Sequence, residues 1–145
     1  MTAADLVEVL RQTKTEQLAR EAIQATADAI TSLNRGQLLK GNSRTGRVDT
    51  YRRMKYARAK ATLNPGAGTP PDNVDLKVTG AFHRGMITKL NQDTIEIMST
   101  DCKEKKLIGQ YGEKVFGLNE ENQAIYNQQH FAPEFMRRFQ DATGL

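Results

Sequence analysis

The stretch RGMITKLNQDTIEIMST, residues 84–100, decides the fold class of this chain. Apolar and polar side chains alternate over residues 84–90 and again over residues 94–100, and the polar triplet Asn91-Gln92-Asp93 stands between the two runs. Successive side chains of a strand face opposite sides of a sheet, so two alternating runs joined by a short polar connection predict an antiparallel β-hairpin. Around this hairpin we expect a rigid centre, with Phe82 and either Ile95 or Ile97 buried.

Residues 2–33, upstream of the hairpin, predict a long helix. Apolar side chains recur every three to four positions after residue 17, whereas residues 11–17 are polar, so the helix is expected to break or become exposed there. We interpret the segment as an ordinary packing helix that Gly36 terminates. Two capping boxes mark helix starts, Thr2 with Asp5 and Thr13 with Glu16.

Three shorter helices are expected after the hairpin. The first covers residues 103–111 and is closed by Gly112, and Asn119 caps the second. Pro133 suits the first position of the last helix, because a proline loses no hydrogen bond there. One face of that last helix is expected to hold Ala132, Phe135, Met136, Phe139 and Ala142, and Gly144 ends it. The pattern predicts an α+β domain over residues 1–145, with a long N-terminal helix and C-terminal helices packed on a small antiparallel sheet.

Length and composition exclude several classes of protein. A chain of 145 residues fits one domain, and no apolar run approaches the roughly 18–20 residues that span a bilayer. Residues 1–10 carry two acids and no Lys or Arg, unlike a secretory signal. The single cysteine, Cys102, forms no internal disulfide, and two histidines beside it make a poor zinc site. We therefore expect a protein made in the cytoplasm, with no membrane anchor.

Positive charge is concentrated in residues 35–60, which carry nine basic side chains and one acid, Asp49, in a chain of net charge +4. Such a stretch attracts nucleic acid, acidic lipid headgroups or an acidic protein surface, and a solvated helix face is the plain alternative. Residues 51–61 predict a short amphipathic helix whose outer face is basic. The partner contacts that we expect on this face are Arg52, Arg53, Lys55 and Lys60.

A loop rich in proline and glycine follows over residues 64–73. Its prolines, Pro65, Pro70 and Pro71, exclude regular structure, so the loop is expected to be exposed. A loop of this length inside one domain commonly has a function. We expect these three prolines to contact a neighbouring subunit.

The sequence offers no constellation typical of an enzyme. Neither His83 nor His130 has an acidic or thiol neighbour at helix or strand spacing, and Cys102 has no histidine partner. The Gly-rich residues 64–68 lack the helix and the Lys-Ser/Thr pair of a phosphate-binding loop. We therefore expect no catalytic residues, no metal site and no cofactor.

Several short motifs occur in an order that resembles a known family. Residues 74–86, VDLKVTGAFHRGM, join an apolar–polar run to Thr-Gly, an aromatic residue, a basic residue and the first strand of the hairpin. This element is similar to one found in small tailed-phage morphogenesis proteins of the tail-completion or head–tail connector type. Four further motifs match in order, LNRGQL at 33–38, YARAK at 56–60, YGEKVFGLN at 111–119 and ATGL at 142–145. Many relatives end in a Pro-Arg-Pro-Phe-like segment, where this chain has FAPEF at 131–135, so terminator and connector both stay open.

The resemblance implies a structural virion protein in the phage tail or neck, with no enzymatic activity and no cofactor. It implies copies assembled into a homo-oligomeric ring against neighbouring tail or connector proteins, with transient contact to genomic DNA. The alternative reading is a small basic nucleic-acid-binding module. For the basic stretch we favour an acidic protein partner, because a ring that bound DNA tightly would slow its passage.

Overall fold

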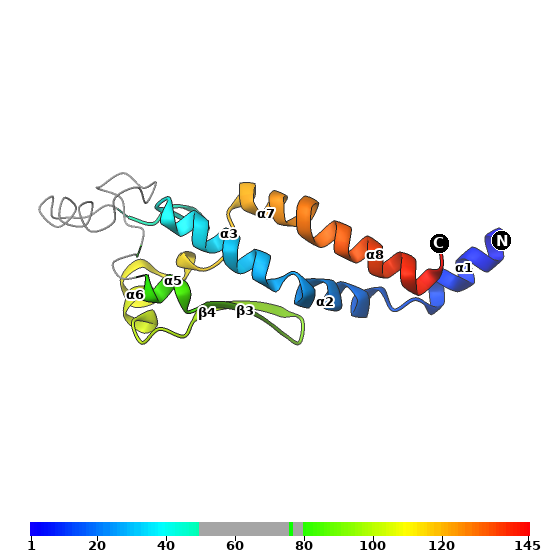
Figure 1. The fold of residues 1–145 in the computed structure, drawn as a ribbon, viewed down its shortest axis with the longest axis horizontal. Coiled ribbons are helices and arrows are strands. Elements are labelled where there is room, and N and C mark those ends of the chain that lie inside the picture. The colour runs from blue at the N-terminus through cyan, green and yellow to red at the C-terminus, as the bar shows by residue number, and fades with distance from the viewer. Residues whose placement is uncertain (50–75, 77–79) are drawn as a thin grey trace, which may run out of the picture.

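The computed structural model describes residues 1–49, 76 and 80–145, and it confirms the α+β class. Two long helical arms lie side by side, and a β-hairpin runs along one of them (Figure 1). Both chain termini lie at the same end of this elongated frame. The helix expected over residues 51–61 and the loop over residues 64–73 lie outside the described residues.

The first arm consists of the helices α1 (Ala3–Gln12), α2 (Thr15–Ala25) and α3 (Ala27–Leu39). The capping box at its start is confirmed: Asp5 N donates to Thr2 Oγ1 at 3.1 Å, and Thr2 N donates to the Asp5 carboxylate at 2.8 Å. The predicted break also occurs, between α1 and α2. The second capping box is wrong, because Thr13 Oγ1 donates backward to Val9 O at 2.7 Å and so belongs to the end of α1.

The end of this arm differs from the prediction in two ways. Thr26 separates α2 from α3, with its Oγ1 hydrogen-bonded to Ala22 O at 2.7 Å. Gly36 does not end the helix, which continues to Leu39 because the next turn buries Gln37 and Leu38. Gly41, at φ 80°, provides the actual stop, and its N–H donates to Leu38 O at 2.8 Å.

Two antiparallel hairpins follow. The small one pairs β1 (Asn42–Ser43) with β2 (Gly46–Arg47). The larger one pairs β3 (Met86–Asn91) with β4 (Thr94–Ser99), in a register that runs from Met86 opposite Ser99 to Asn91 opposite Thr94. The predicted hairpin is therefore confirmed, although Arg84 belongs to the short helix α5 (Ala81–Arg84) rather than to the first strand.

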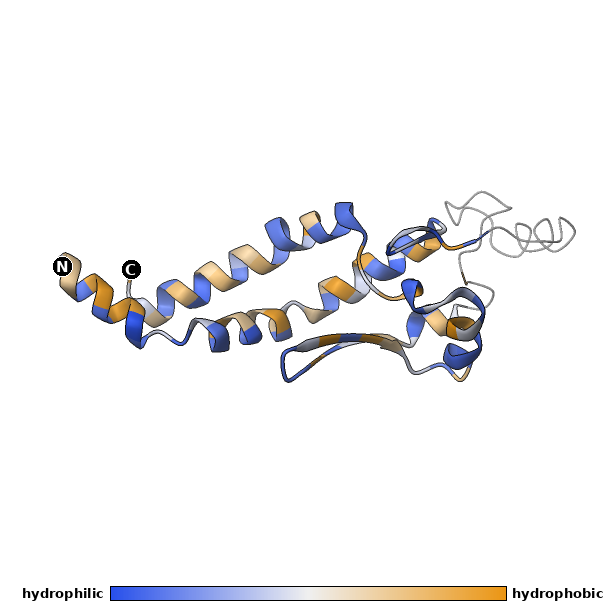
Figure 2. Cartoon of the chain, turned by 180° about the vertical axis from the view of Figure 1, so that it is seen from behind, coloured by the Kyte–Doolittle hydropathy of each residue, from blue (hydrophilic) through white to orange (hydrophobic). Residues whose placement is uncertain are grey.

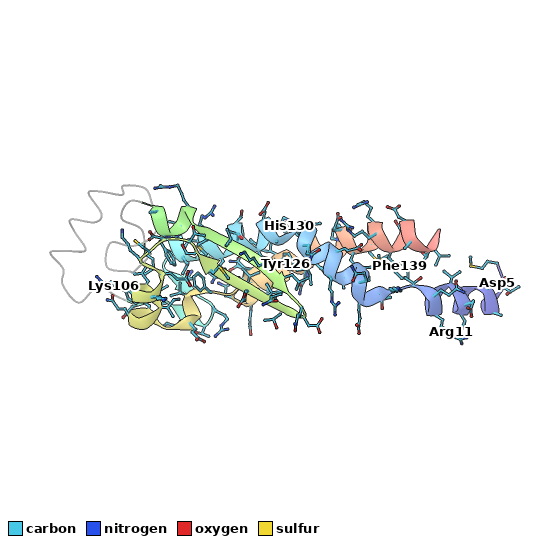
Figure 3. The ribbon with its side chains drawn as sticks, turned by 90° about the horizontal axis from the view of Figure 1, so that it is seen from below. Asp5, Arg11, Lys106, Tyr126, His130 and Phe139 are labelled. Carbon is cyan, nitrogen blue, oxygen red and sulfur yellow. The ribbon has the colours of Figure 1, made fainter. Side chains whose placement is uncertain are left out.

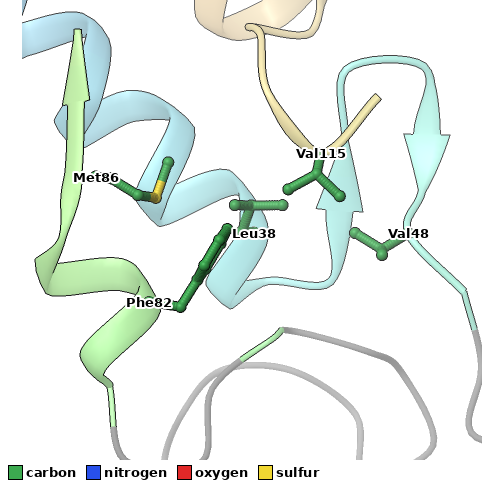
Figure 4. Close-up of a cluster of buried hydrophobic side chains, with 5 residues drawn as sticks. All are labelled: Leu38, Val48, Phe82, Met86 and Val115. Carbon is green, nitrogen blue, oxygen red and sulfur yellow. The ribbon is translucent and has the colours of Figure 1, made fainter. Parts of the chain in front are cut away.

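The hydrophobic core lies where α3, α5 and β3 meet. The buried side chains are Leu38, Val48, Phe82, Met86 and Val115 (Figure 4). Ile97 packs against this cluster, whereas Ile95 is 42% exposed because it lies next to the tip of the hairpin, beyond the reach of the core. The expected burial is thus confirmed for Phe82 and is met partly by Ile97.

Downstream of the hairpin come α6 (Glu104–Tyr111), the 3₁₀ turn η1 (Glu113–Val115) and α7 (Glu120–Tyr126). Gly112, at φ 86°, ends α6 as expected. The cap predicted at Asn119 is also present, since its Oδ1 accepts from Asn122 N at 2.9 Å. Glu120 and Glu121 fill the first turn of α7, where negative charge favours the helix dipole.

Pro133 lies in the first turn of the last helix, as predicted, but that helix does not begin independently of the one before it. α7 passes through the π-helical turn η2 (Asn127–Phe131) directly into α8 (Ala132–Thr143), and the flanking residues Tyr126 and Phe131 have helical backbone angles. Proline cannot donate the hydrogen bond of a helix interior, and a π turn is one way in which a helix absorbs such an irregularity. Gly144 ends α8 as expected, at φ 70°.

The inward face of this second arm is only partly the predicted one. Phe135 and Phe139 are half-buried, whereas Met136 is 48% exposed and Ala132 and Ala142 are exposed as well. The π turn shifts the helix phase, so Tyr126 and Phe131 precede Phe135 and Phe139 in one ladder of ring contacts, with centroids 5.7–6.3 Å apart. α8 packs on α2 and α7 on α3, while β3 packs on α3 and α2. The first arm thus separates the second arm from the sheet, contrary to the expectation that the C-terminal helices cover the sheet (Figure 1).

Two buried side-chain amides of α3 form hydrogen bonds with the backbone of the segment between η1 and α7. Asn34 Nδ2 donates to Val115 O at 3.1 Å, and its Oδ1 accepts from Gly117 N at 2.9 Å. Gln37 Nε2 donates to Gly117 O at 2.8 Å, and its Oε1 accepts from Asn119 N at 2.9 Å. Val115 O, both backbone groups of Gly117, and Asn119 N therefore have partners in α3, and these bonds position the start of the second arm.

Candidate interaction surface

The residues that the sequence singled out as partner contacts lie outside the described part of the chain. They are Arg52, Arg53, Lys55, Lys60, Pro65, Pro70 and Pro71. The structure therefore does not show whether these residues lie close together. It does describe the beginning of the basic stretch, residues 35–49.

Two arginines within residues 35–49 contact other elements of the fold. Arg35 Nε donates to His83 O at 2.8 Å and so ties α3 to α5. The aliphatic part of Arg44 covers Gly117, where an added Cβ would lie 2.7 Å from Arg44 Cδ. Arg44 N also donates to Lys114 O at 2.9 Å. Not every cation of the stretch is therefore free to bind a partner.

Several cations belong to segments at the end of the frame that lies opposite the termini, although others, such as Arg11, Lys89 and Arg137, are exposed elsewhere. Figure 3 shows Lys106 at this end and Asp5 and Arg11 at the other. The described basic residues here are Lys40, Arg44, Arg47, Lys103, Lys105, Lys106 and Lys114, against the acids Asp49, Asp101, Glu104 and Glu113. A hollow of about 490 Å³ lies among them, lined by Arg47, Val48, Asp49, Gln110, Tyr111 and Lys114. We call these seven cations the basic end.

Exposed apolar side chains gather at the end that holds the termini. In α1, Leu6 is 37%, Val7 51% and Leu10 44% exposed, and the helix buries none of its side chains. α1 projects beyond the end of α8, and Figure 2 shows the hydrophobic residues along α1. Leu145 at the C-terminus is also 48% exposed. We call Leu6, Val7 and Leu10 the α1 stripe.

Another side of α1 faces the helices α2 and α8 of the same chain. Val9 and Thr13 line a hollow of about 400 Å³ together with Leu18 of α2 and Ala142 of α8. Val9 is half-buried as a result. The α1 stripe is therefore the part of the helix that its own chain leaves uncovered.

The expectation of an ordinary packing helix is wrong for α1, which buries none of its side chains. A signal for the exposed stripe was present, because apolar residues 6, 7 and 10 form a complete helical face before the polar residues 11–17. Periodicity gives the direction of an apolar face but does not tell which partner covers it. A break directly after a short amphipathic segment is the feature that could have identified a projecting helix.

The chemically versatile side chains occupy separate places. His83 lies buried in α5 with its ring edge-on to Phe82 at 5.8 Å, and His130 stacks on Tyr126 at 6.3 Å. Cys102 is exposed, with its Sγ 3.8 Å from Asp101 Oδ1. Across residues 1–49, 76 and 80–145, no three His, Cys, Asp or Glu side chains are placed to hold a metal ion.

Comparison of the chain with protein-family models, curated proteins and solved structures found no match. Among the described helices, none combines the length and the apolar character needed to cross a membrane.

Proposed function

We propose that this chain is a structural virion protein of a tailed phage, a subunit of the ring that completes the tail or joins it to the head. The observation that carries the proposal is the chemical difference between the two ends of an elongated frame. The basic end lies opposite the end with the α1 stripe and the termini. The ordered motifs from residue 33 to residue 145 supply the phage context.

A frame with unlike ends suits head-to-tail assembly. Rings are closed by heterologous contacts, in which one surface of a subunit meets a different surface of its neighbour. Isolated charge pairs at such contacts are worth about 0–1 kcal/mol each, so they orient the subunits more than they hold them. The chain therefore needs apolar contacts as well, and the α1 stripe shows that it keeps apolar surface exposed.

The basic end also favours the alternative function, a small nucleic-acid-binding module. Arg47 and Lys114 line the same hollow, and Lys114 Nζ donates to the backbone oxygen Arg47 O at 3.5 Å, so two basic residues lie close together there. Binding that rests on such cations weakens steeply with salt. A measurement of DNA affinity at several salt concentrations therefore distinguishes the two functions. We expect strong, salt-sensitive binding for a nucleic-acid-binding module and weak binding for a virion subunit that contacts DNA only while the genome passes.

The proposal is tested in particles from a lysogen that encodes the chain. We expect mass spectrometry to find the chain in purified virions, and deletion of its gene to leave unjoined heads and tails or tails of irregular length. Complementation with the intact gene serves as the control. Purified virions that lack the chain, together with normal particles after the deletion, would contradict the proposal.

A further inference from the structure

The two halves of the second arm are attached to the first arm in different ways. The first half, α7, is held by buried and half-buried polar groups. Asn122 Nδ2 donates to Gln37 Oε1 at 3.1 Å and to Leu33 O at 3.3 Å. Tyr126, at the end of α7, is buried and shares a hydrogen bond of 2.8 Å with Thr26 Oγ1. Separation of α7 from the first arm would leave these groups without partners, which costs free energy.

The second half, α8, lies along α2 with much weaker contacts (Figure 1). None of the side chains of α8 is buried, and Phe135 and Phe139 are only half-buried. Across the described part of the chain, one polar contact joins α8 to the first arm, with Arg138 Nη1 3.4 Å from Glu21 Oε2. The two side chains are 28% and 39% exposed, and an ion pair this exposed contributes little to the attachment.

The face of α2 that α8 covers contains Ala22, the one buried residue of α2. Leu18, Ala22 and Thr26 are four residues apart, so they form one line along the helix. Leu18 borders Ala142 of α8 in the hollow at one end of this line, and Thr26 bonds Tyr126 at the other. Ala22 therefore lies opposite α8, and removal of α8 would expose it.

The junction between α7 and α8 is the place where this arm can bend. Residues 127–131 form the π-helical turn η2, and Pro133 directly after it has no N–H to donate to the preceding turn. Sharp bends in helices occur at prolines and π turns. α8 itself is reinforced, because Glu134 accepts from Arg137 at 2.6 Å and from Arg138 at 2.8 Å. These features allow α8 to move as one unit relative to α7.

We infer that α8 opens away from α2 at η2 while α7 and the core stay folded. The closed state covers Ala22, and the open state exposes Ala22, Phe135 and Phe139 to solvent. The ion pair of Arg138 with Glu21 favours the closed state. Opening requires less free energy than global unfolding, because it disrupts few apolar contacts. The inference concerns the isolated chain and does not rest on the proposed virion role.

The first experiment measures the rate of thiol labelling in a Cys102→Ser background, because Cys102 is exposed. Ala22→Cys reports the opening of α8, and Val115→Cys, fully buried in the core, reports global unfolding. Each rate is divided by the labelling rate of the same protein unfolded in urea. We expect Ala22→Cys to be labelled at least about tenfold faster than Val115→Cys. Low concentrations of urea should accelerate labelling of Val115→Cys far more, since global unfolding exposes more surface.

The ion pair is tested in the Ala22→Cys protein. We expect Glu21→Gln to accelerate labelling about twofold to fivefold, because the open state does not contain the pair. Glu16→Gln is the matched control, since Glu16 is an exposed carboxylate of α2 that forms no ion pair with the described residues, and it should leave the rate unchanged. Equal far-UV circular dichroism shows that the variants fold.

Equal labelling rates and equal urea dependence at positions 22 and 115 would overturn the inference, as would equal effects of Glu21→Gln and Glu16→Gln. Amide hydrogen exchange then distinguishes the opening of α8 from the unfolding of α2. We expect the amides of residues 135–143 to exchange faster than those of residues 19–25, because α2 also packs on α3 and β3. Exchange of the α2 amides as fast as that of α8 would show that α2 unfolds, and it would overturn the inference.

Discussion

Asn34 shows how a single buried amide can fix a chain connection. The side chain is fully buried, and its two polar atoms bind Val115 O and Gly117 N. Asn34→Leu keeps a side chain of similar size but leaves both backbone groups without partners. Each such buried group costs about 1–3 kcal/mol, so we expect the unfolding free energy in urea to fall by about 2–5 kcal/mol. Gln24→Leu on the exposed surface of α2 is the control and should change it by less than about 0.5 kcal/mol.

Two glycines predict opposite effects of the same substitution. A Cβ at Gly85 would lie 2.9 Å from both Ser99 Oγ and Thr100 Oγ1. Ser99 cannot turn away easily, because its Oγ donates to Phe82 O at 2.8 Å. We expect Gly85→Ala to lower the thermal midpoint, at a cost of about 1–3 kcal/mol. Gly36→Ala meets nothing within 4 Å inside α3 and should raise it, by about 0.5–1 kcal/mol. Equal shifts for the two variants would contradict this packing.

At the scale of elements, strand alternation and helix caps could be predicted, but helix continuity could not. The hairpin, the break before α2, and the stops at Gly112 and Gly144 follow from local chemistry, and each is present. The helix end predicted at Gly36 is wrong. Burial of the next turn stabilises the helix by more than the low helix propensity of one glycine destabilises it.

Pro133 lies in the first turn of α8, as predicted, but the continuity of that helix with α7 was not foreseen. A π turn lets α7 continue into α8, so the proline does not mark an independent start. For the candidate site, the basic face expected at residues 52–60 lies outside the described residues and stays a prediction, whereas the interpretation of the α1 stripe as ordinary packing was wrong. Local patterns indicate where apolar faces are, but long-range packing decides which of them stay exposed.

The contact between the two arms predicts a pH dependence. Tyr126 is 4% exposed and shares a 2.8 Å hydrogen bond with Thr26 Oγ1, and burial raises the pKa of its hydroxyl. Tyrosine in the unfolded chain ionises near about pH 10. The unfolded state therefore loses this proton first, so the stabilisation is complete below that pH and is lost as the pH rises through the higher folded pKa.

We therefore expect the unfolding free energy of the wild type to fall more steeply above about pH 10 than that of Tyr126→Phe. In a spectrophotometric titration, one tyrosine of the folded wild type should ionise later than the others and be missing from the variant. Tyr111→Phe, at a half-buried tyrosine of α6, is the control and should retain the late component. Parallel stability curves for the wild type and Tyr126→Phe would rule out a burial effect at Tyr126.

At the scale of the whole molecule, the basic end and the exposed α1 stripe lie at opposite ends. The described basic end holds seven cations and four acids, and residues 50–60 add five more cations to the sequence, whereas the acids of α1 lie at the far end. The core lies near the basic end and does not use α1. The core is thus separate from the surfaces proposed for assembly, so we expect surface charge to be changeable without loss of the fold.

The basic face expected over residues 52–60 offers the corresponding test of the virion role. We expect replacement of Arg52, Arg53, Lys55 and Lys60 by Glu to leave the far-UV circular dichroism unchanged but to stall particles at joining, with separate heads and tails in electron micrographs. Exposed charge pairs set encounter and orientation, so reversing four of them turns attraction to an acidic protein surface into repulsion. The same four positions changed to Gln are the control and should give a milder defect, because they remove attraction without adding repulsion. Normal joining with failed genome delivery would instead identify DNA as the partner, since lost phosphate contacts act on DNA alone.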